Sequence, residues 1–186
     1  MLSIAFKEWA AVCRALADGR QTVILRKGGI AEEAGEFRPE HPRFWLYPTY
    51  FHEQQAGLKP EFRPYLDAAD ADRPDPGRLR LSHLCEVAAV HRAATLDAAL
   101  ALDRFHGWTP DVVRKRFEYR EPGLYALVVR VFAVATPAEL AEGAGYAGCK
   151  SWVALDAGAE DHPAAPVIPD EAFARVLTDI QSAFAR

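Results

Sequence analysis

The sequence predicts an α+β fold with a mixed, largely antiparallel sheet of about five strands and packed helices at both ends of the chain. Apolar and polar residues alternate along the predicted strands, whereas strands of a parallel sheet read as continuous apolar runs. Helical and strand-like segments follow each other as α β β, insertion, β α α β α β α, without the regular alternation of a doubly wound fold. Half of the 186 residues are apolar, enough to form a core without disulfides or metal.

The first segment, residues 4–17, has helical spacing of its apolar side chains, and Gly19 is expected to end that helix. The apolar residues on this face are Phe6, Trp9, Ala10, Cys13, Leu16 and Ala17. Residues 21–26 are β-branched and alternating, so they predict a strand that ends in a turn at residues 27–29.

The middle of the chain contains a short strand and an irregular excursion. Residues 31–42 are polar and acidic and predict a loop, and residues 44–47 predict a strand closed by Pro48. Residues 53–78 are rich in Pro and Asp, which indicates an irregular insertion with about one helical turn. We therefore expect a single domain over residues 1–186 that carries this insertion.

The next segments alternate between strands and helices. Residues 79–90 predict a long strand, and Thr95 is expected to cap a helix that runs to Phe105. Pro110 suits the first turn of another helix, where its missing N–H costs no hydrogen bond. Residues 124–135 are rich in Val, Leu and Tyr and predict the clearest strand.

The C-terminal part is predicted to end in an amphipathic helix. Residues 136–139 form a capping box that predicts a short helix ended by Gly143. A strand near residues 150–155 and a Pro-rich loop at residues 156–169 follow. Asp170 is then the expected cap of a helix with one apolar stripe, formed by Phe173, Val176, Leu177, Ile180 and Phe184.

Composition excludes several classes of protein. The net charge of −4 and the pI near 5.9 give no global attraction to nucleic acid or to an anionic membrane. The odd, widely spaced cysteines Cys13, Cys85 and Cys149 predict a reducing compartment, and Lys7 and Glu8 interrupt the apolar start before it could act as a signal peptide. We therefore expect a cytoplasmic protein with no membrane span, no metal and no cofactor.

The distribution of charge along the chain is more informative than its total. Residues 1–30 and 79–135 are net positive, while residues 31–78 and 136–186 are net acidic. The second positive segment contains a dense group of cations, Arg114, Lys115, Arg116 and Arg120. These side chains suit a phosphate backbone, or they are a solvated helix C-terminus whose dipole favours cations.

A Gly-Gly turn follows two cations at Arg26-Lys27-Gly28-Gly29. Successive backbone N–H groups and two positive charges are what a bound phosphate requires. The alternative is an ordinary turn with solvated flanking charges, because the spacing is not that of a nucleotide-binding loop.

Aromatic and ring-bearing side chains are concentrated at Trp45, Tyr47, Tyr50, Phe51 and His52. Such a cluster can stack on nucleobases, although aromatic strand residues also serve as core. Tyr47, Tyr50 and His52 are the candidates that we assign to a bound base or ring.

Four sequence blocks resemble the bacterial family known as domain of unknown function 1802: Phe6–Trp9, Leu25–Ile30, Phe44–Glu53 and Phe117–Tyr125. The resemblance covers nearly the whole chain and implies no established activity. Some members are joined to Mrr-type restriction nuclease domains, which implies a role beside DNA and a protein partner in a restriction system. The order of a long strand, a helix and a second strong strand is also similar to PUA-like barrels, several of which read RNA or modified DNA bases.

The sequence therefore favours a domain that binds DNA, RNA or a nucleotide-like ligand over an enzyme. Arg26, Lys27, Gly28 and Gly29 are assigned to phosphate, and Arg120 and Arg130 to further anion contacts. One alternative is a small metal-dependent hydrolase or nuclease that uses Glu32, Glu36, His52 and Glu53. A second is a structural module whose exposed aromatic residues dock on another protein.

Overall fold

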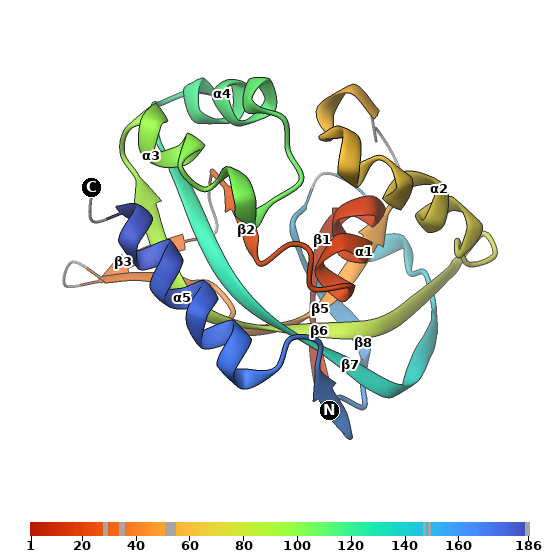
Figure 1. The fold of residues 1–186 in the computed structure, drawn as a ribbon. Helices are drawn as coiled ribbons and strands as arrows, with labels where there is room; N and C mark the ends of the chain where they lie inside the picture. The colour runs from red at the N-terminus through yellow and green to blue at the C-terminus, as the bar shows by residue number, and fades with distance from the viewer. Residues whose placement is uncertain (28–29, 34–35, 51–54, 147, 149, 185–186) are drawn as a thin grey trace.

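The computed structural model describes residues 1–27, 30–33, 36–50, 55–146, 148 and 150–184 (Figure 1). The elements in chain order are β1 (Leu2–Trp9), α1 (Ala10–Ala17), β2 (Val23–Arg26), β3 (Ile30–Glu33), β4 (Glu36–Pro39), β5 (Arg43–Thr49), η1 (Gln55–Gly57), η2 (Pro60–Phe62), α2 (Pro64–Ala71), β6 (Arg78–Ala93), α3 (Leu96–Leu100), η3 (Asp103–Phe105), α4 (Pro110–Glu118), β7 (Leu124–Ala141), η4 (Ala144–Tyr146), β8 (Trp152–Ala159), β9 (Ala164–Pro166) and α5 (Asp170–Phe184). The η elements are single 3-10 turns.

One seven-stranded sheet organises the molecule. Its order is β2-β7-β6-β5-β1-β8. The short strand β9 pairs with residues 132–134 of β7, beyond the part that pairs with β2. Only the β1–β5 pair of this sheet is parallel, so the predicted mixed, largely antiparallel α+β fold is confirmed, with more strands than the five expected. The strands β3 and β4 form a separate two-stranded hairpin.

The two longest strands, β6 and β7, are paired from Arg78↔Ala141 to Ala93↔Leu124. The register shifts between Leu81 and His83 and again between Val87 and Ala89. An extra residue in one strand bends it and increases its twist, and both strands sweep across the molecule in a curve (Figure 1). The sheet therefore has an inner and an outer surface.

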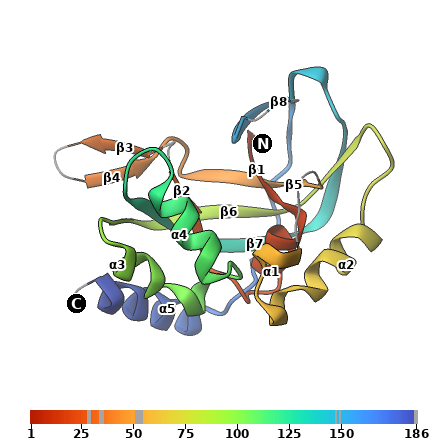
Figure 2. The same ribbon diagram turned by 90° about the horizontal axis from the view of Figure 1, so that it is seen from above.

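Each surface of the sheet carries its own apolar core. Successive side chains of a strand point to opposite faces, and the core residues follow this alternation. The outer core contains Phe6, Phe44 and Cys85 and is covered by helices that include α1, α3 and α5 (Figure 2). The inner core contains their chain neighbours Ala5, Trp45 and Leu84, together with Tyr47, Tyr146 and Val153.

The predicted helix over residues 4–17 is wrong in its first half, because Leu2–Trp9 is the strand β1. Parallel pairing with β5 on one side and antiparallel pairing with β8 on the other satisfies its backbone. Both faces of β1 contact a core, since Ala5 and Phe6 are each fully buried. Apolar residues on both faces produced a helical spacing by coincidence, and α1 begins only at Ala10.

Three further expectations are corrected by strand pairing. The predicted acidic loop at residues 31–42 contains the hairpin of β3 and β4. Residues 136–139, the predicted capping box, do not start a helix, because their pairing with β6 continues the strand β7 to Ala141. The loop at residues 156–169 contains the end of β8 and the strand β9.

Several local predictions are confirmed. The hydroxyl of Thr95 accepts a hydrogen bond from the backbone N–H of Ala98, and Pro110 opens α4. The helix capped by Thr95 ends at Leu100, and a 3-10 turn at Asp103–Phe105 completes the predicted stretch. Within the described ranges, no helix combines the length and apolar character needed to cross a membrane.

The segment at residues 53–78 contains more regular structure than the irregular excursion predicted. It contributes η1, η2 and α2, and α2 packs against α1. Leu58 forms an isolated antiparallel bridge with Trp108, and the backbone N–H of Lys59 donates to the carbonyl of Gly107 at 2.9 Å. The segment is therefore joined to the body of the molecule.

Gly107 lies directly against the ring of Phe62, which is nearly buried. A Cβ atom at Gly107 would lie 2.4 Å from Cδ1 of that ring. We expect Gly107→Ala to lower the free energy of unfolding by about 1–3 kcal/mol, the usual cost of overpacking. Gly145→Ala is the matched control because no atom lies within 4 Å of its added Cβ. Urea unfolding measures both, and equal effects would contradict this packing.

His106 is fully buried beside the ammonium group of Lys59. Its Nδ1 accepts a hydrogen bond from the backbone N–H of Trp108 at 3.2 Å, so Nε2 carries the proton, and no described group accepts it. Burial is the main cause, and the charge of Lys59 the second, that lowers the pKa of His106 to about 4. The imidazole is therefore neutral in the folded protein at neutral pH.

This lowered pKa predicts a loss of stability in mild acid. Below its ordinary pKa of 6.5, His106 binds a proton in the unfolded chain but not in the folded one, so stability falls as the pH drops from 6.5 towards 4. At pH 5 this loss in the free energy of unfolding amounts to about 2 kcal/mol. His106→Asn retains an acceptor for Trp108 and should flatten this part of the unfolding curve. An unchanged slope between pH 7 and pH 5 would show that another group is responsible.

Candidate functional site

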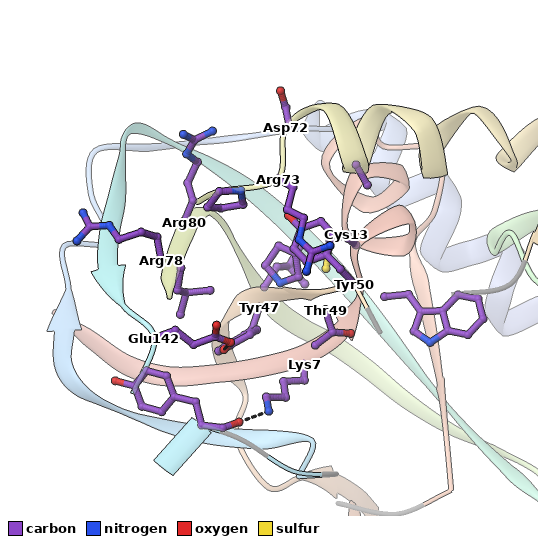
Figure 3. Close-up of a pocket in the computed structure, with 18 of the residues that line it drawn as sticks. Lys7, Cys13, Tyr47, Thr49, Tyr50, Asp72, Arg73, Arg78, Arg80 and Glu142 are labelled. Atoms are coloured by element: carbon purple, nitrogen blue, oxygen red, sulfur yellow. Dashed lines mark hydrogen bonds between the residues drawn. The ribbon is translucent and has the colours of Figure 1, made fainter. Parts of the chain in front are cut away.

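A cleft of about 840 Å³ opens between the ends of several strands and the segment that follows α2 (Figure 3). Its walls come from the ends of β1 and β5, from α1, from the start of β6 and from the segment that follows β7. Residues 72–77, the last part of the predicted insertion, form one side. This volume lies in the range of about 300–1,000 Å³ typical of ligand-binding pockets.

The cleft is electropositive although the whole chain is acidic. It is lined by six cations, Lys7, Arg14, Arg73, Arg78, Arg80 and Lys150. Three carboxylates also line it, those of Asp72, Asp75 and Glu142. Cationic side chains around a concave surface concentrate the field and attract anions.

Some of these cations are already paired. Arg14 forms an ion pair with Asp72 at 2.6 Å, and Arg80 forms one with Glu139 at 2.6 Å. Among the described residues, Arg73, Arg78 and Lys150 have no carboxylate at ion-pair distance. These three charges are therefore available to a bound anion.

Tyr47 and Glu142 meet at the floor of the cleft (Figure 3). The Tyr47 hydroxyl donates a hydrogen bond to Oε1 of Glu142. Burial raises the pKa of Tyr47, and this hydrogen bond raises it further, so the phenol stays protonated. The carboxylate is thus held facing the cleft.

Two cations lie over the tyrosine rings of the cleft. Lys7 Nζ is 5.3 Å from the centre of the Tyr47 ring, and it donates hydrogen bonds to the carbonyls of Tyr146 and Gly148. The guanidinium of Arg73 lies 4.7 Å from the centre of the Tyr50 ring. Aromatic faces therefore hold positive charge at the entrance and at the floor of the cleft.

Of the binding residues predicted from the sequence, Tyr47 and Tyr50 line the cleft. Gly28, Gly29 and His52 lie outside the described residues, as does Glu53 of the alternative metal site. Glu32 and Glu36 belong to the β3–β4 hairpin. Their predicted roles stay predictions.

Arg26 lies behind the cleft wall. Its guanidinium packs 4.6 Å from the centre of the Phe6 ring and donates to the hydroxyl of Ser151 at 2.7 Å. Burial lowers the pKa of Arg26, while the carboxylate of Glu8 opposes that shift. Ser151 itself lines the cleft, so Arg26 contacts a lining residue without lining the cleft itself.

Lys27 binds the chain around the end of α4. Its ammonium donates hydrogen bonds to the carbonyls of Phe117, Glu121 and Gly123. Desolvation lowers the pKa of Lys27, and the nearby Glu121 carboxylate partly offsets this. The predicted phosphate role competes with this use of the same ammonium.

The remaining predicted cations lie apart from the cleft and from each other. Arg120 has a positive φ of 63° and stacks on the exposed Tyr119 ring at 5.1 Å. Arg130 pairs with Asp170 at the start of α5 and lies 5.4 Å from the rings of both Phe132 and Phe173. The structure therefore does not bring all the predicted binding residues into one site.

Sequence reasoning missed most of the charged lining of the cleft. Arg78 and Arg80 alternate with Leu79 and Leu81 at the start of β6, a pattern that indicates one exposed and one buried face. Glu142 follows a segment that was predicted to be helical. Signals for the individual residues existed, but nothing in the sequence showed that they face one another.

The fold is similar to that of ASCH domains, which are PUA-like barrels. The crystal structure of ASCH from Zymomonas mobilis aligns with 94% of this chain and 93% of its own, at 14% identity and a TM-score of 0.50. Two variants of that Zymomonas mobilis protein, at 14% and 12% identity, give TM-scores of 0.46 and 0.47 with the same 94% of this chain, and 96% and 94% of theirs. At this level of identity the likeness shows the fold alone.

The chain belongs to the family described as a domain of unknown function, DUF1802, whose model matches residues 5–179. The family resemblance of the four sequence blocks is thereby confirmed. No curated protein matches the sequence.

The three carbonyls held by Lys27 predict a structural effect of its loss. We expect Lys27→Met to lower the free energy of unfolding by about 1 kcal/mol, because the hydrogen bonds to the end of α4 disappear. Lys115→Met is the control, since Lys115 is an exposed neighbour on α4. Urea denaturation compares the two variants. A stability equal to that of the wild type would indicate that Lys27 is free for a ligand.

Proposed function

We propose that this protein binds single-stranded nucleic acid, RNA or DNA, through the electropositive cleft. The observation that carries the proposal is the joint presence of Arg73, Arg78 and Lys150, without carboxylate partners among the described residues, and of Tyr50 in one cavity. The buried Tyr47 forms part of the floor of that cavity. Cations suit the phosphate backbone, and aromatic rings suit bases that are not stacked in a duplex.

The shape of the site favours an unpaired strand. A cleft of about 840 Å³ accepts a nucleotide or a strand end, whereas a duplex is read by an element that projects into its groove. The PUA-like fold is compatible with RNA or DNA binding and supports the same class of ligand.

Two other functions stay predictions. A metal-dependent hydrolase would use Glu32, Glu36, His52 and Glu53, and a divalent ion would then raise the melting temperature of the protein. The link to restriction systems rests on the family resemblance, and it would require a protein partner or a DNA ligand.

Fluorescence polarisation with 12-nucleotide RNA and DNA probes, single- and double-stranded and at two salt concentrations, tests the proposed function. We expect Arg73→Ala combined with Arg78→Ala to weaken single-strand binding about tenfold. The slope of log K against log salt should also become shallower by about 0.7 for each lost phosphate contact.

Arg175→Ala is the matched control because Arg175 is exposed on α5 and does not line the cleft. The proposal is wrong if the double variant binds like the wild type, or if Arg175→Ala weakens binding equally. A loss of binding in Arg120→Ala instead would place the ligand on the cations at the end of α4.

A further inference from the structure

Asp72 places a carboxylate among the arginines of the cleft. It lies at the edge of the cleft directly after α2, next to Arg73 (Figure 3). Its Oδ2 is 2.6 Å from the guanidinium of Arg14 on α1. Both side chains are about half exposed, at 55% for Asp72 and 41% for Arg14.

A second arginine is also affected by Asp72. The hydrogen bond to Glu139 is the main reason that the pKa of Arg80 is raised, and the charge of Asp72 adds to the effect. His83 also lines the cleft, and burial lowers its pKa below the usual 6.5, with a further lowering by the charge of Arg14, so its imidazole is mainly neutral at pH 7. The positive charge around Asp72 therefore comes from arginines, Arg14, Arg73 and Arg80, and not from His83.

The position of Asp72 is unfavourable for its own helix. Asp72 is the C-terminal cap of α2, where the helix dipole disfavours negative charge. Arg14 is therefore the group that stabilises this carboxylate. When both side chains of an ion pair are exposed, the pair changes an equilibrium constant by less than a factor of about five. Another anion can therefore readily replace Asp72 at Arg14.

A different ion pair of this chain illustrates the contrast. Asp161 is only 8% exposed and is bound by Arg43 and by the N-terminal ammonium group. Removing one partner there would leave a buried charge, whereas releasing Asp72 returns it to water. Asp72 can leave its arginine at little cost.

We propose that the guanidinium of Arg14 is a phosphate-binding subsite of the cleft, and that the Asp72 carboxylate occupies it until a ligand phosphate replaces it. The inference rests on the proposed function, which supplies the phosphodiester. A guanidinium donates hydrogen bonds to carboxylate and phosphate oxygens alike, so a phosphate can take the place of the Asp72 carboxylate at Arg14. The chain thus contains its own competitor for the ligand.

The test compares two variants that each remove one negative charge from the same segment. Asp72→Asn frees Arg14, while Asp75→Asn removes a carboxylate that also lines the cleft but has no ion pair among the described residues. With the single-stranded 12-nucleotide probes, we expect Asp72→Asn to bind about threefold more tightly than the wild type. Its salt slope should be steeper by about 0.7, and Asp75→Asn should change affinity by less than about twofold.

A double-mutant cycle assigns the effect to Arg14. In an Arg14→Gln background, Asp72→Asn should give no gain beyond that of Asp75→Asn. Inorganic phosphate, used as a competitor and as the sole ligand in thermal unfolding, distinguishes a free phosphate from the phosphodiester of a strand. Each variant is checked by its unfolding curve.

The outcomes separate this inference from the proposed function. If the wild type binds the probes through Arg73 and Arg78 but Asp72→Asn matches Asp75→Asn, the subsite at Arg14 is wrong. If no variant binds a strand yet inorganic phosphate stabilises Asp72→Asn more than the wild type, the subsite takes free phosphate and the proposed function is wrong. If no variant binds a strand and inorganic phosphate stabilises Asp72→Asn no more than the wild type, both are wrong.

Discussion

The pairing of β6 with β7 is the constraint on which the rest of the structure depends. These two strands are the longest, and every other strand of the main sheet is attached to one of them directly or through β5. The two register shifts bend the pair, so the sheet separates an inner core around Trp45 from an outer core around Phe44. The register also builds the cleft, because the pairing of Arg78 with Ala141 sets Glu142 beside the start of β6.

The positive charge of the chain is used in two ways. Arg26, Lys27 and Arg116 support the fold, since each packs on an aromatic ring or binds backbone carbonyls near α4. In the cleft, by contrast, Arg73, Arg78 and Lys150 line a cavity and have no carboxylate at ion-pair distance among the described residues. A guanidinium suits both uses because its plane stacks on rings and its fork binds carboxylates or phosphates. Charge in a sequence therefore marks a binding site only when the fold leaves it facing a cavity.

Features that depend on interactions within a few residues were predictable from the sequence, and features that depend on distant strands were not. Thr95, Pro110 and the apolar stripe of α5 were interpreted correctly because a cap, a first-turn proline and an amphipathic face act within a few residues. The helical prediction for residues 4–9 and the capping box at residues 136–139 failed because distant strands supplied hydrogen-bond partners. Pairing across the sheet overrode the local preference of both segments.

The sequence by itself determined the α+β class, the mostly antiparallel sheet and the family, and it predicted two of the three tyrosines that line the cleft, Tyr47 and Tyr50. These follow from periodicity and from short motifs, which are properties of neighbouring residues. Only the tertiary structure decided which cations meet in the cleft. Arg14, the neighbouring Arg73 and Arg78, and Lys150 come from three separate parts of the chain. Arg26 packs on Phe6 and Lys27 binds carbonyls near α4, so neither lines the cleft. A charged side chain has no local pattern that reveals its partner, because its environment is set by whichever surfaces the fold brings against it.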